Sequence, residues 1–178
     1  YTPYKKDLLK QLADATKRHG IKLGLYYSTP DWHFNSPNPE RNPVDGKISV
    51  FGKVSKANED FQVAQLEELM TNYGDIVEVF FDMGEPTLAQ SKRFRDAVKK
   101  YQPNALINGR VMNNQGDFLT MPDNHVPDSP ITDYPWETPG TFYHTWGYKS
   151  WVKGLPLEQQ ISVQVRKLSD IASMGGNF

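Results

Sequence analysis

The chain has 178 residues, of which 38% are hydrophobic and 12% aromatic, and its formal net charge at pH 7 is −1. This length suits one domain, and the near-zero charge gives no general attraction to nucleic acid or to an anionic membrane. No apolar run approaches the ~18 residues of a membrane-spanning helix. The sequence has no cysteine, which excludes disulfides, a thiol nucleophile and a cysteine-based metal site. The four histidines lack helical spacing, which excludes a helical zinc motif.

Helical and strand patterns alternate along much of the chain. Apolar residues at helical spacing predict helices over residues 5–19, 58–73, 87–101 and 157–172. Runs of β-branched and aromatic residues predict strands over residues 21–28, 76–82 and 105–110. Residues 29–57 are expected to form a long polar loop. Residues 111–156 are expected to be mostly irregular, with at most a short strand around residues 141–146.

This alternation predicts an α/β fold. Repeated βα units imply a parallel sheet with right-handed crossovers, and the fold class we expect is a (β/α)8-like TIM-type barrel. Such a barrel needs eight strands and typically ~250 residues. Three clear strands and one doubtful strand amount to about half of it, so we expect the chain to carry only part of a barrel.

Asp82 ends the most apolar of the predicted strands and is followed by Gly84 and Pro86. A strand this apolar is expected to be covered on both faces. Barrel enzymes place catalytic groups at the carboxyl ends of their strands, so Asp82 is a candidate catalytic residue. The alternative is that Asp82 only caps the next helix or starts a turn.

Polar and aromatic side chains also follow the other strands. Tyr26 and Tyr27 lie near the end of the first strand, and Arg110 lies at the end of the third. Aromatic residues follow at Trp32, Trp136, Trp146, Tyr148 and Trp151. A carboxylate, a guanidinium group and aromatic rings suit a polyhydroxylated ligand such as a sugar. The alternatives are that the aromatic rings fill the core and that Arg110 forms a salt bridge at the end of the sheet.

A glycosidase needs a second carboxyl group opposite the first. Retaining enzymes hold the pair ~5–5.5 Å apart, and inverting enzymes ~6.5–9.5 Å apart. The candidates are Glu85, Asp117, Asp123, Asp128, Asp133 and Glu137. Sequence spacing by itself does not choose among them.

Several motifs, taken in order, resemble the α-L-fucosidases of glycoside hydrolase family 29. They are Gly24-Leu25-Tyr26-Tyr27-Ser28 with Asp31-Trp32, Phe81-Asp82-Met83-Gly84, Asn108-Gly109-Arg110, Asp117-Phe118 with Thr120 and Pro122-Asp123, Tyr134-Pro135-Trp136-Glu137-Thr138, and Leu168-Ser169-Asp170-Ile171-Ala172-Ser173-Met174-Gly175-Gly176-Asn177. Together they run over nearly the whole chain. Each motif is weak alone, but their joint order is highly specific.

The resemblance implies roles for individual residues. Asp82 matches the catalytic nucleophile, and Tyr26, Phe80 and Arg110 match positions that contact the sugar. Asp123 matches the acid/base position, where the family usually has Glu. The reserve candidate for the acid/base is Glu137. Trp32 and Glu137 are further expected substrate-binding residues.

The resemblance also implies a function. The expected protein is a retaining exo-glycosidase that removes terminal α-L-fucosyl residues from oligosaccharides or glycoconjugates, without cofactor or metal and without nucleic-acid or membrane partners. Residues 1–178 are expected to form part of one catalytic barrel domain, namely its C-terminal part. Two alternatives stay open: a catalytically inactive carbohydrate-binding barrel remnant, and a barrel glycosidase for another sugar.

Overall fold

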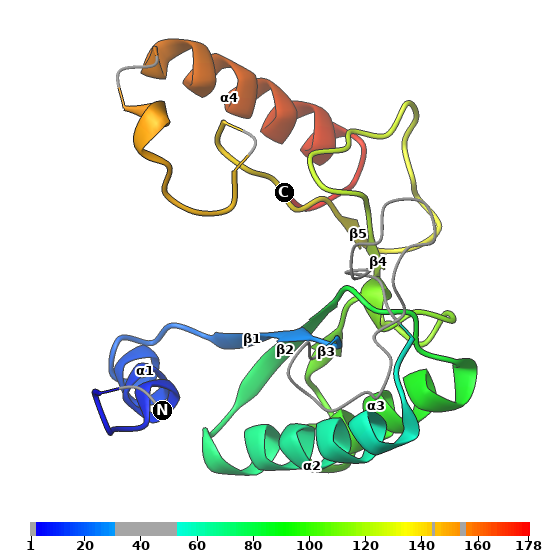
Figure 1. The fold of residues 1–178 in the computed structure, drawn as a ribbon. Helices are drawn as coiled ribbons and strands as arrows, with labels where there is room; N and C mark the ends of the chain where they lie inside the picture. The colour runs from blue at the N-terminus through cyan, green and yellow to red at the C-terminus, as the bar shows by residue number, and fades with distance from the viewer. Residues whose placement is uncertain (1–2, 31–52, 144, 154–155) are drawn as a thin grey trace, which may run out of the picture. The chain divides into compact units, whose positions relative to one another are not determined.

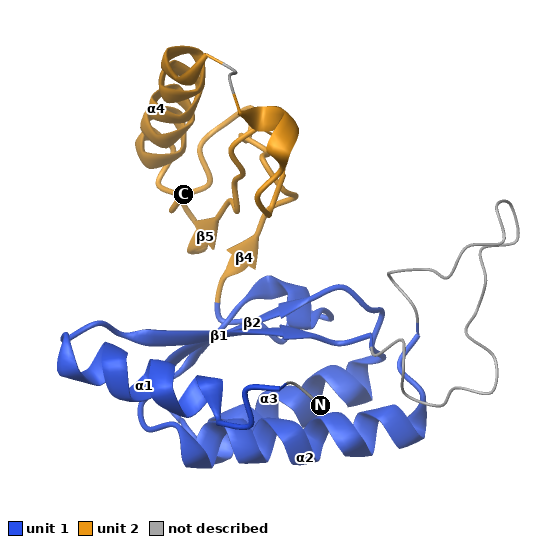
Figure 2. Ribbon diagram, turned by 60° about the vertical axis from the view of Figure 1, so that its left-hand side comes forward, with its two compact units in different colours: residues 1–117 blue, residues 118–178 orange. Residues whose placement is uncertain are grey.

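The computed structural model describes residues 3–30, 53–143, 145–153 and 156–178 (Figure 1). The chain divides into two compact units, residues 1–117 and residues 118–178 (Figure 2). Across the described ranges, every helix is too short or too polar to span a lipid bilayer.

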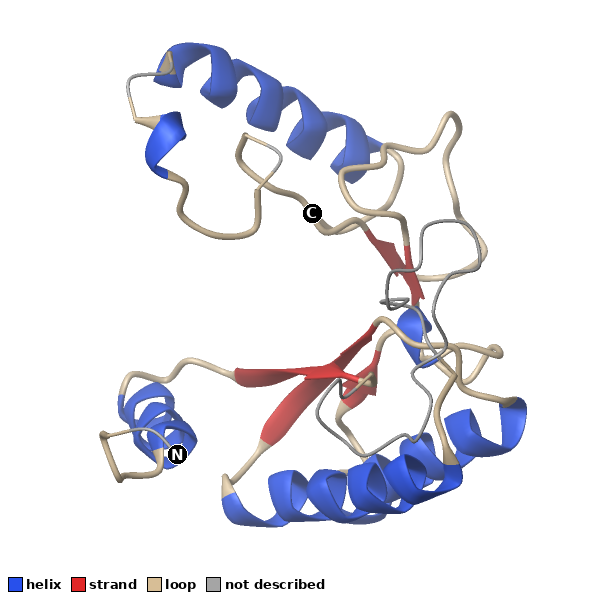
Figure 3. Cartoon of the chain, in the orientation of Figure 1, coloured by secondary structure: helices blue, strands red, loops and turns tan. Residues whose placement is uncertain are grey.

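Helices and strands alternate in the first unit, as the sequence predicts (Figure 3). Its elements are α1 (Leu8–Arg18), β1 (Leu23–Ser28), α2 (Lys56–Asn72), β2 (Ile76–Asp82), α3 (Leu88–Tyr101) and β3 (Leu106–Ile107). The three strands form a parallel sheet in the order β1-β2-β3. Helices α2 and α3 pack against each other on one side of this sheet (Figure 1). The predicted βα units are therefore present.

Side-chain caps define where the helices begin. The side chains of Asp7 and Ser55 accept hydrogen bonds from backbone N–H groups at the starts of α1 and α2. Thr87 and Gln90 form a reciprocal capping box at the start of α3. Because Ser55 caps α2, that helix begins at Lys56, two residues before the predicted start.

The two faces of the sheet have different environments. Along β1 the residues alternate between buried and exposed, and Leu25 and Tyr27 belong to the buried face. The opposite face carries Tyr26 beside Phe80 and Ser28 beside Asp82. On β2 the residues of this second face, Glu78, Phe80 and Asp82, are half-buried, so coverage of β2 on both faces stays a prediction. Its apolar sequence serves one packed face and one face of aromatic and acidic side chains.

The third strand is shorter than predicted. It ends at Ile107, and a 3-10 helix, Gly109–Val111, follows in place of the last predicted strand residues. Between them, the buried side chain of Asn108 donates to the carbonyl of Phe81 (2.9 Å) and accepts from its backbone N–H (2.7 Å). The amide thus replaces backbone pairing and lets the chain turn at Arg110.

The second unit contains two short parallel strands and one long helix. These are β4 (Leu119–Thr120), β5 (Trp136–Glu137) and α4 (Leu157–Ser173), with a 3-10 helix at Ser150–Val152. The predicted last helix is confirmed, but the strands of two residues were missed because periodicity needs longer runs. Around residues 141–146, where at most a short strand is expected, an isolated antiparallel bridge joins Phe142 to Thr145.

Candidate active site

The carboxylate of Asp82 lies at the carboxyl end of β2 and is held by two side chains. Its Oδ2 accepts a hydrogen bond from the hydroxyl of Tyr26 at 2.5 Å. Its Oδ1 accepts from Nη1 of Arg110 at 2.8 Å, in an ion pair whose two side chains are 17% and 18% exposed. Residues 26, 82 and 110, which lie far apart in the sequence, therefore meet at one end of the sheet.

This environment keeps Asp82 ionised. Burial by itself raises the pKa of Asp82, but hydrogen bonds from Tyr26 and Arg110, the charge of Arg110 and the backbone of Met83 outweigh it. The resulting pKa lies below the usual value for aspartate. At neutral pH the group is a carboxylate, as a nucleophile requires.

An aromatic ring completes the cluster. Phe80 lies on the same face of β2, and its ring stacks on that of Tyr26 with 5.9 Å between centroids and 15° between planes. The guanidinium group of Arg110 lies 5.5 Å from the centroid of the Phe80 ring. Tyr26 remains 59% exposed, so its ring is accessible on this face. We call Tyr26, Phe80, Asp82 and Arg110 the Asp82 cluster.

The turn after Asp82 is tightly defined. Met83 and Gly84 both have positive φ, at 58° and 72°. The hydroxyl of Thr29 donates to the carbonyl of Met83 at 2.7 Å, and a Cβ on Gly84 would lie 2.0 Å from that hydroxyl oxygen. Only glycine fits there. The residue that caps α3 is Thr87, so the alternative that Asp82 serves as its helix cap was wrong.

Glu78 was not predicted as part of this face. It pairs with Gly24 in the register and lies on the same side of β2 as Phe80 and Asp82. Burial raises the pKa of Glu78. The sequence signal was a single acidic residue within the apolar strand, at even spacing from Asp82, so that alternation places both on one face.

In the second unit, Asp123 and Glu137 differ in environment. Asp123 is exposed in a turn. Glu137 is half-buried on β5, next to the buried Trp136, and its Oε1 accepts from the hydroxyl of Thr120 at 3.1 Å. Glu137 thus lies at the end of a parallel strand pair, the kind of position that Asp82 has in the first unit.

The other predicted residues separate into three groups. Trp32 lies outside the described residues. The side chain of Asp117 accepts from the backbone N–H of Ile107 and pairs with Lys99 at 2.8 Å, which gives it a structural role. Glu85, Asp128 and Asp133 are exposed, as are Trp146, Tyr148 and Trp151. Within the described ranges, no group of three or more His, Asp or Glu side chains is placed to hold a metal ion.

Comparisons with known proteins identify relatives along the chain. The sequence model of the family described as Alpha-L-fucosidase matches residues 1–178. α-L-Fucosidase 1 of Arabidopsis thaliana is 38% identical over 76 residues, which make up 43% of this chain and 12% of that protein.

Solved structures extend this likeness to the fold. Unliganded α-L-fucosidase AlfC from Lactobacillus casei is 31% identical, with a TM-score of 0.75, over 99% of this chain and 57% of that chain. α-L-Fucosidase isoenzyme 1 from Paenibacillus thiaminolyticus is 28% identical, with a TM-score of 0.78, over 99% of this chain and 46% of that chain. AlfC has also been solved with α-L-fucose and, as a variant, with 4-nitrophenyl α-L-fucopyranoside.

The chain therefore spans about half the length of the solved relatives and shares their α/β fold. The resemblance drawn from the motifs is confirmed by the family match, which covers every residue of the chain. This chain belongs to the α-L-fucosidase family of glycoside hydrolases.

Proposed function

We propose that this protein is a retaining exo-α-L-fucosidase acting on terminal fucosyl residues of oligosaccharides or glycoconjugates. The observation that carries the proposal is the Asp82 cluster, in which Tyr26 and Arg110 hold an ionised carboxylate beside the aromatic ring of Phe80. The substrate class is supported by the relative AlfC, which has been solved with fucose and with a fucoside. We also propose that residues 1–178 form part of one (β/α)8-like catalytic barrel.

Asp82 acts as the nucleophile in this proposal. One carboxylate oxygen attacks the anomeric carbon of the fucoside and displaces the glycosidic oxygen, which gives a covalent fucosyl-enzyme. Water then hydrolyses this ester and releases fucose. The guanidinium group of Arg110 keeps Asp82 ionised, and Tyr26 orients the carboxylate. Phe80 provides an apolar surface for the sugar.

A second carboxyl group protonates the leaving oxygen and later activates water. Such a group must be protonated near neutral pH, which calls for a site withdrawn from solvent. Glu137 is the more withdrawn from solvent, because it is half-buried on β5 while Asp123 is exposed. We therefore propose Glu137 as the acid/base and keep Asp123, the position favoured by the family resemblance, as the competing candidate.

The nucleophile is tested with Asp82→Asn in the full-length protein on an aryl α-L-fucoside. We expect kcat to fall by ~10³-fold or more, since a nucleophile cannot be replaced by its amide. Asp82→Gly should regain turnover when azide is added. Asp96→Asn, at an exposed position of α3, is the control and should retain activity. Near-normal kcat in Asp82→Asn would reject the assignment.

The acid/base is tested by comparing Glu137→Ala with Asp123→Ala. The variant that lacks the true acid should lose far more activity on substrates with poor leaving groups than on activated aryl fucosides. Equal losses on both kinds of substrate in Glu137→Ala would indicate that Asp123, and not Glu137, is the acid/base.

A further inference from the structure

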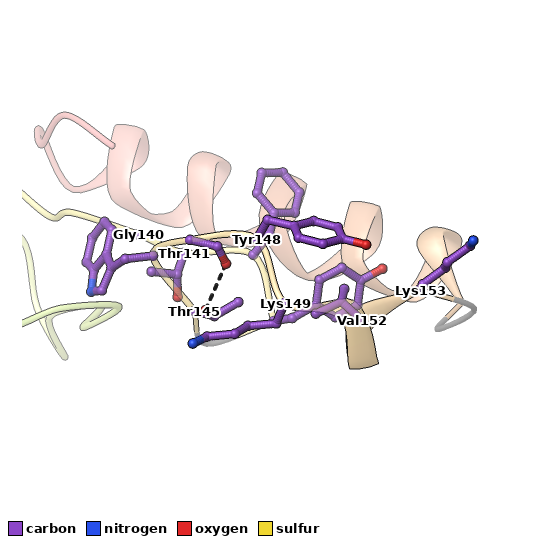
Figure 4. A pocket seen from close by; sticks show the side chains of 11 residues that line it. Gly140, Thr141, Thr145, Tyr148, Lys149, Val152 and Lys153 are labelled. Atoms are coloured by element: carbon purple, nitrogen blue, oxygen red, sulfur yellow. Dashed lines mark hydrogen bonds between the residues drawn. The ribbon is translucent and has the colours of Figure 1, made fainter. Parts of the chain in front are cut away.

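The second unit contains a pocket of about 500 Å³ that the proposed chemistry does not use. It is lined by residues 140–143, 145–149, 152 and 153, a set that we call the pocket loop (Figure 4). Large aromatic residues line it with much of their surface exposed: Phe142 at 57%, Trp146 at 65% and Tyr148 at 84%. Exposed apolar surface gathered in one concave place is typical of a binding site.

Hydrogen bonds anchor the base of the pocket loop. The buried Thr141 donates its backbone N–H and its hydroxyl to Oδ1 of Asn124, at 2.9 and 3.2 Å. Its carbonyl accepts from the side chain of Gln164 on α4 at 3.0 Å, and Gln160 on the same helix accepts from the backbone of Tyr143 at 3.3 Å. The base is thus held by polar contacts, while Phe142, Trp146 and Tyr148 keep much of their surface exposed.

The chemistry of the lining points to an uncharged pyranose. Aromatic rings stack on the apolar C–H face of a sugar ring, while oxygen atoms of a lining can accept hydrogen bonds from its hydroxyls. The hydroxyls of Thr141 and Thr145 already donate to Asn124 and Gly147, so toward a sugar they act as acceptors. Among the described residues that line the pocket, Lys149 and Lys153 are the charged ones and none is acidic. Figure 4 shows these two side chains pointing in opposite directions, so they do not converge on one anion. The pocket therefore has no site for a charged group held between them.

The pocket adjoins both candidate acids within the second unit. Gly140 of the lining follows Glu137 by three residues, a separation of at most ~11 Å along an extended chain. Asn124, which holds Thr141, directly follows Asp123. Whichever of the two is the acid, it must contact the glycosidic oxygen, and the leaving group lies beyond that oxygen.

We propose that the pocket loop binds an uncharged pyranose ring of the leaving group, so that Trp146 and Tyr148 select fucosylated glycans over simple fucosides. This inference rests on the proposed fucosidase function. The part of the substrate that the pocket recognises is the sugar on the far side of the bond that is cleaved.

The test uses Trp146→Ala and Tyr148→Ala in the full-length protein. The kcat/KM for a fucosylated trisaccharide should fall about tenfold or more, the loss expected from one ring contact. The kcat/KM for 4-nitrophenyl α-L-fucoside should stay within about twofold, because its small aglycone does not fill the pocket. Trp151→Ala is the matched control: Trp151 is 61% exposed beside the pocket but does not line it, so both substrates should be unaffected.

Direct binding separates failure of this inference from failure of the proposed function. The Asp82→Asn protein is titrated with lactose, an uncharged disaccharide without fucose, and binding is followed by saturation-transfer NMR. Binding that is lost in Trp146→Ala and kept in Trp151→Ala supports the pocket even if the protein has no fucosidase activity. Equal loss on both substrates, the same effect from Trp151→Ala, or a lowered melting temperature without any change in selectivity would overturn the inference.

Discussion

Both units of this chain place a carboxylate at the end of a parallel strand pair, but they hold it by different means. Asp82 lies on a sheet whose other face packs into an apolar core. Among the described residues of the second unit, the buried hydrophobic side chains are Trp136 and Ile171. In place of a large hydrophobic core, hydrogen bonds of polar side chains such as Asn124 and Gln164 hold the pocket loop in the second unit.

The helices show the same difference. Phe94 and Val98 of α3 are fully buried against the sheet. Along α4 the large apolar residues are mostly exposed, including Leu157, Ile161 and Val165. A site on a packed sheet is positioned by the whole core, whereas one on a loop depends on a few hydrogen bonds. We infer that the Asp82 cluster is the more rigid of the two regions.

The largest effect on stability is expected from the core of the first unit. Phe94 is fully buried and stacks on Phe81, with 6.2 Å between ring centroids. Phe94→Ala should lower the free energy of unfolding by ~3–5 kcal/mol, because it removes a large side chain and leaves a cavity behind the sheet face that carries Asp82. Chemical denaturation would measure the loss. A loss below about 1 kcal/mol would mean that the core does not support the sheet as described.

Two asparagines, one in each unit, allow a matched comparison. Asn108→Ala should cost ~2–3 kcal/mol, because it leaves both backbone groups of Phe81 unpaired inside the core. Asn124→Ala should cost about 1 kcal/mol, since Asn124 is itself only half-buried and water can replace its side chain. The exposed Asn104→Ala is the control for both. Equal costs for Asn108→Ala and Asn124→Ala would remove the distinction between the units.

The smallest effect is expected from Glu78 and depends on pH. Burial raises the folded-state pKa of Glu78 above the ordinary value of 4.5. The folded state therefore binds this proton more tightly than the unfolded chain, and the resulting stability is present below that ordinary value and lost as the pH rises through the folded pKa. Glu78→Gln should raise the melting temperature at pH 7 and change it little near pH 4. Glu68→Gln, at an exposed position of α2, should change neither value.

The stability that Asp82 contributes depends on pH with the opposite sign, although Asp82 lies on the same face of the sheet as Glu78. Its lowered pKa means that stability from its contacts with Tyr26 and Arg110 is present at neutral pH and is lost as the pH falls through the folded pKa. The pKa values of these two carboxyl groups on one strand therefore shift in opposite directions. Asp82 has a cationic partner, Arg110, whereas burial is the cause that acts on Glu78.

Local sequence was sufficient to predict the α/β alternation and the position of Asp82. The apolar periods of α1 to α4 and the β-branched run before Asp82 are set by neighbouring residues, which is why they can be read without a structure. The same alternation, read with period two, also places Glu78 on the face of Asp82.

What only the tertiary structure decided depends on residues far apart in the chain. The bond from Tyr26 to Asp82 spans 56 positions, and the pairing of Asn108 with Phe81 spans 27. Strands β4 and β5 are two residues long and exist because they pair with each other, so no local hydrophobic period predicts them. The raised pKa of Glu78 likewise comes from burial, which a sequence pattern does not measure. Contacts over such separations arise only when the chain packs, and they determine which of the sequence's many polar residues share one site.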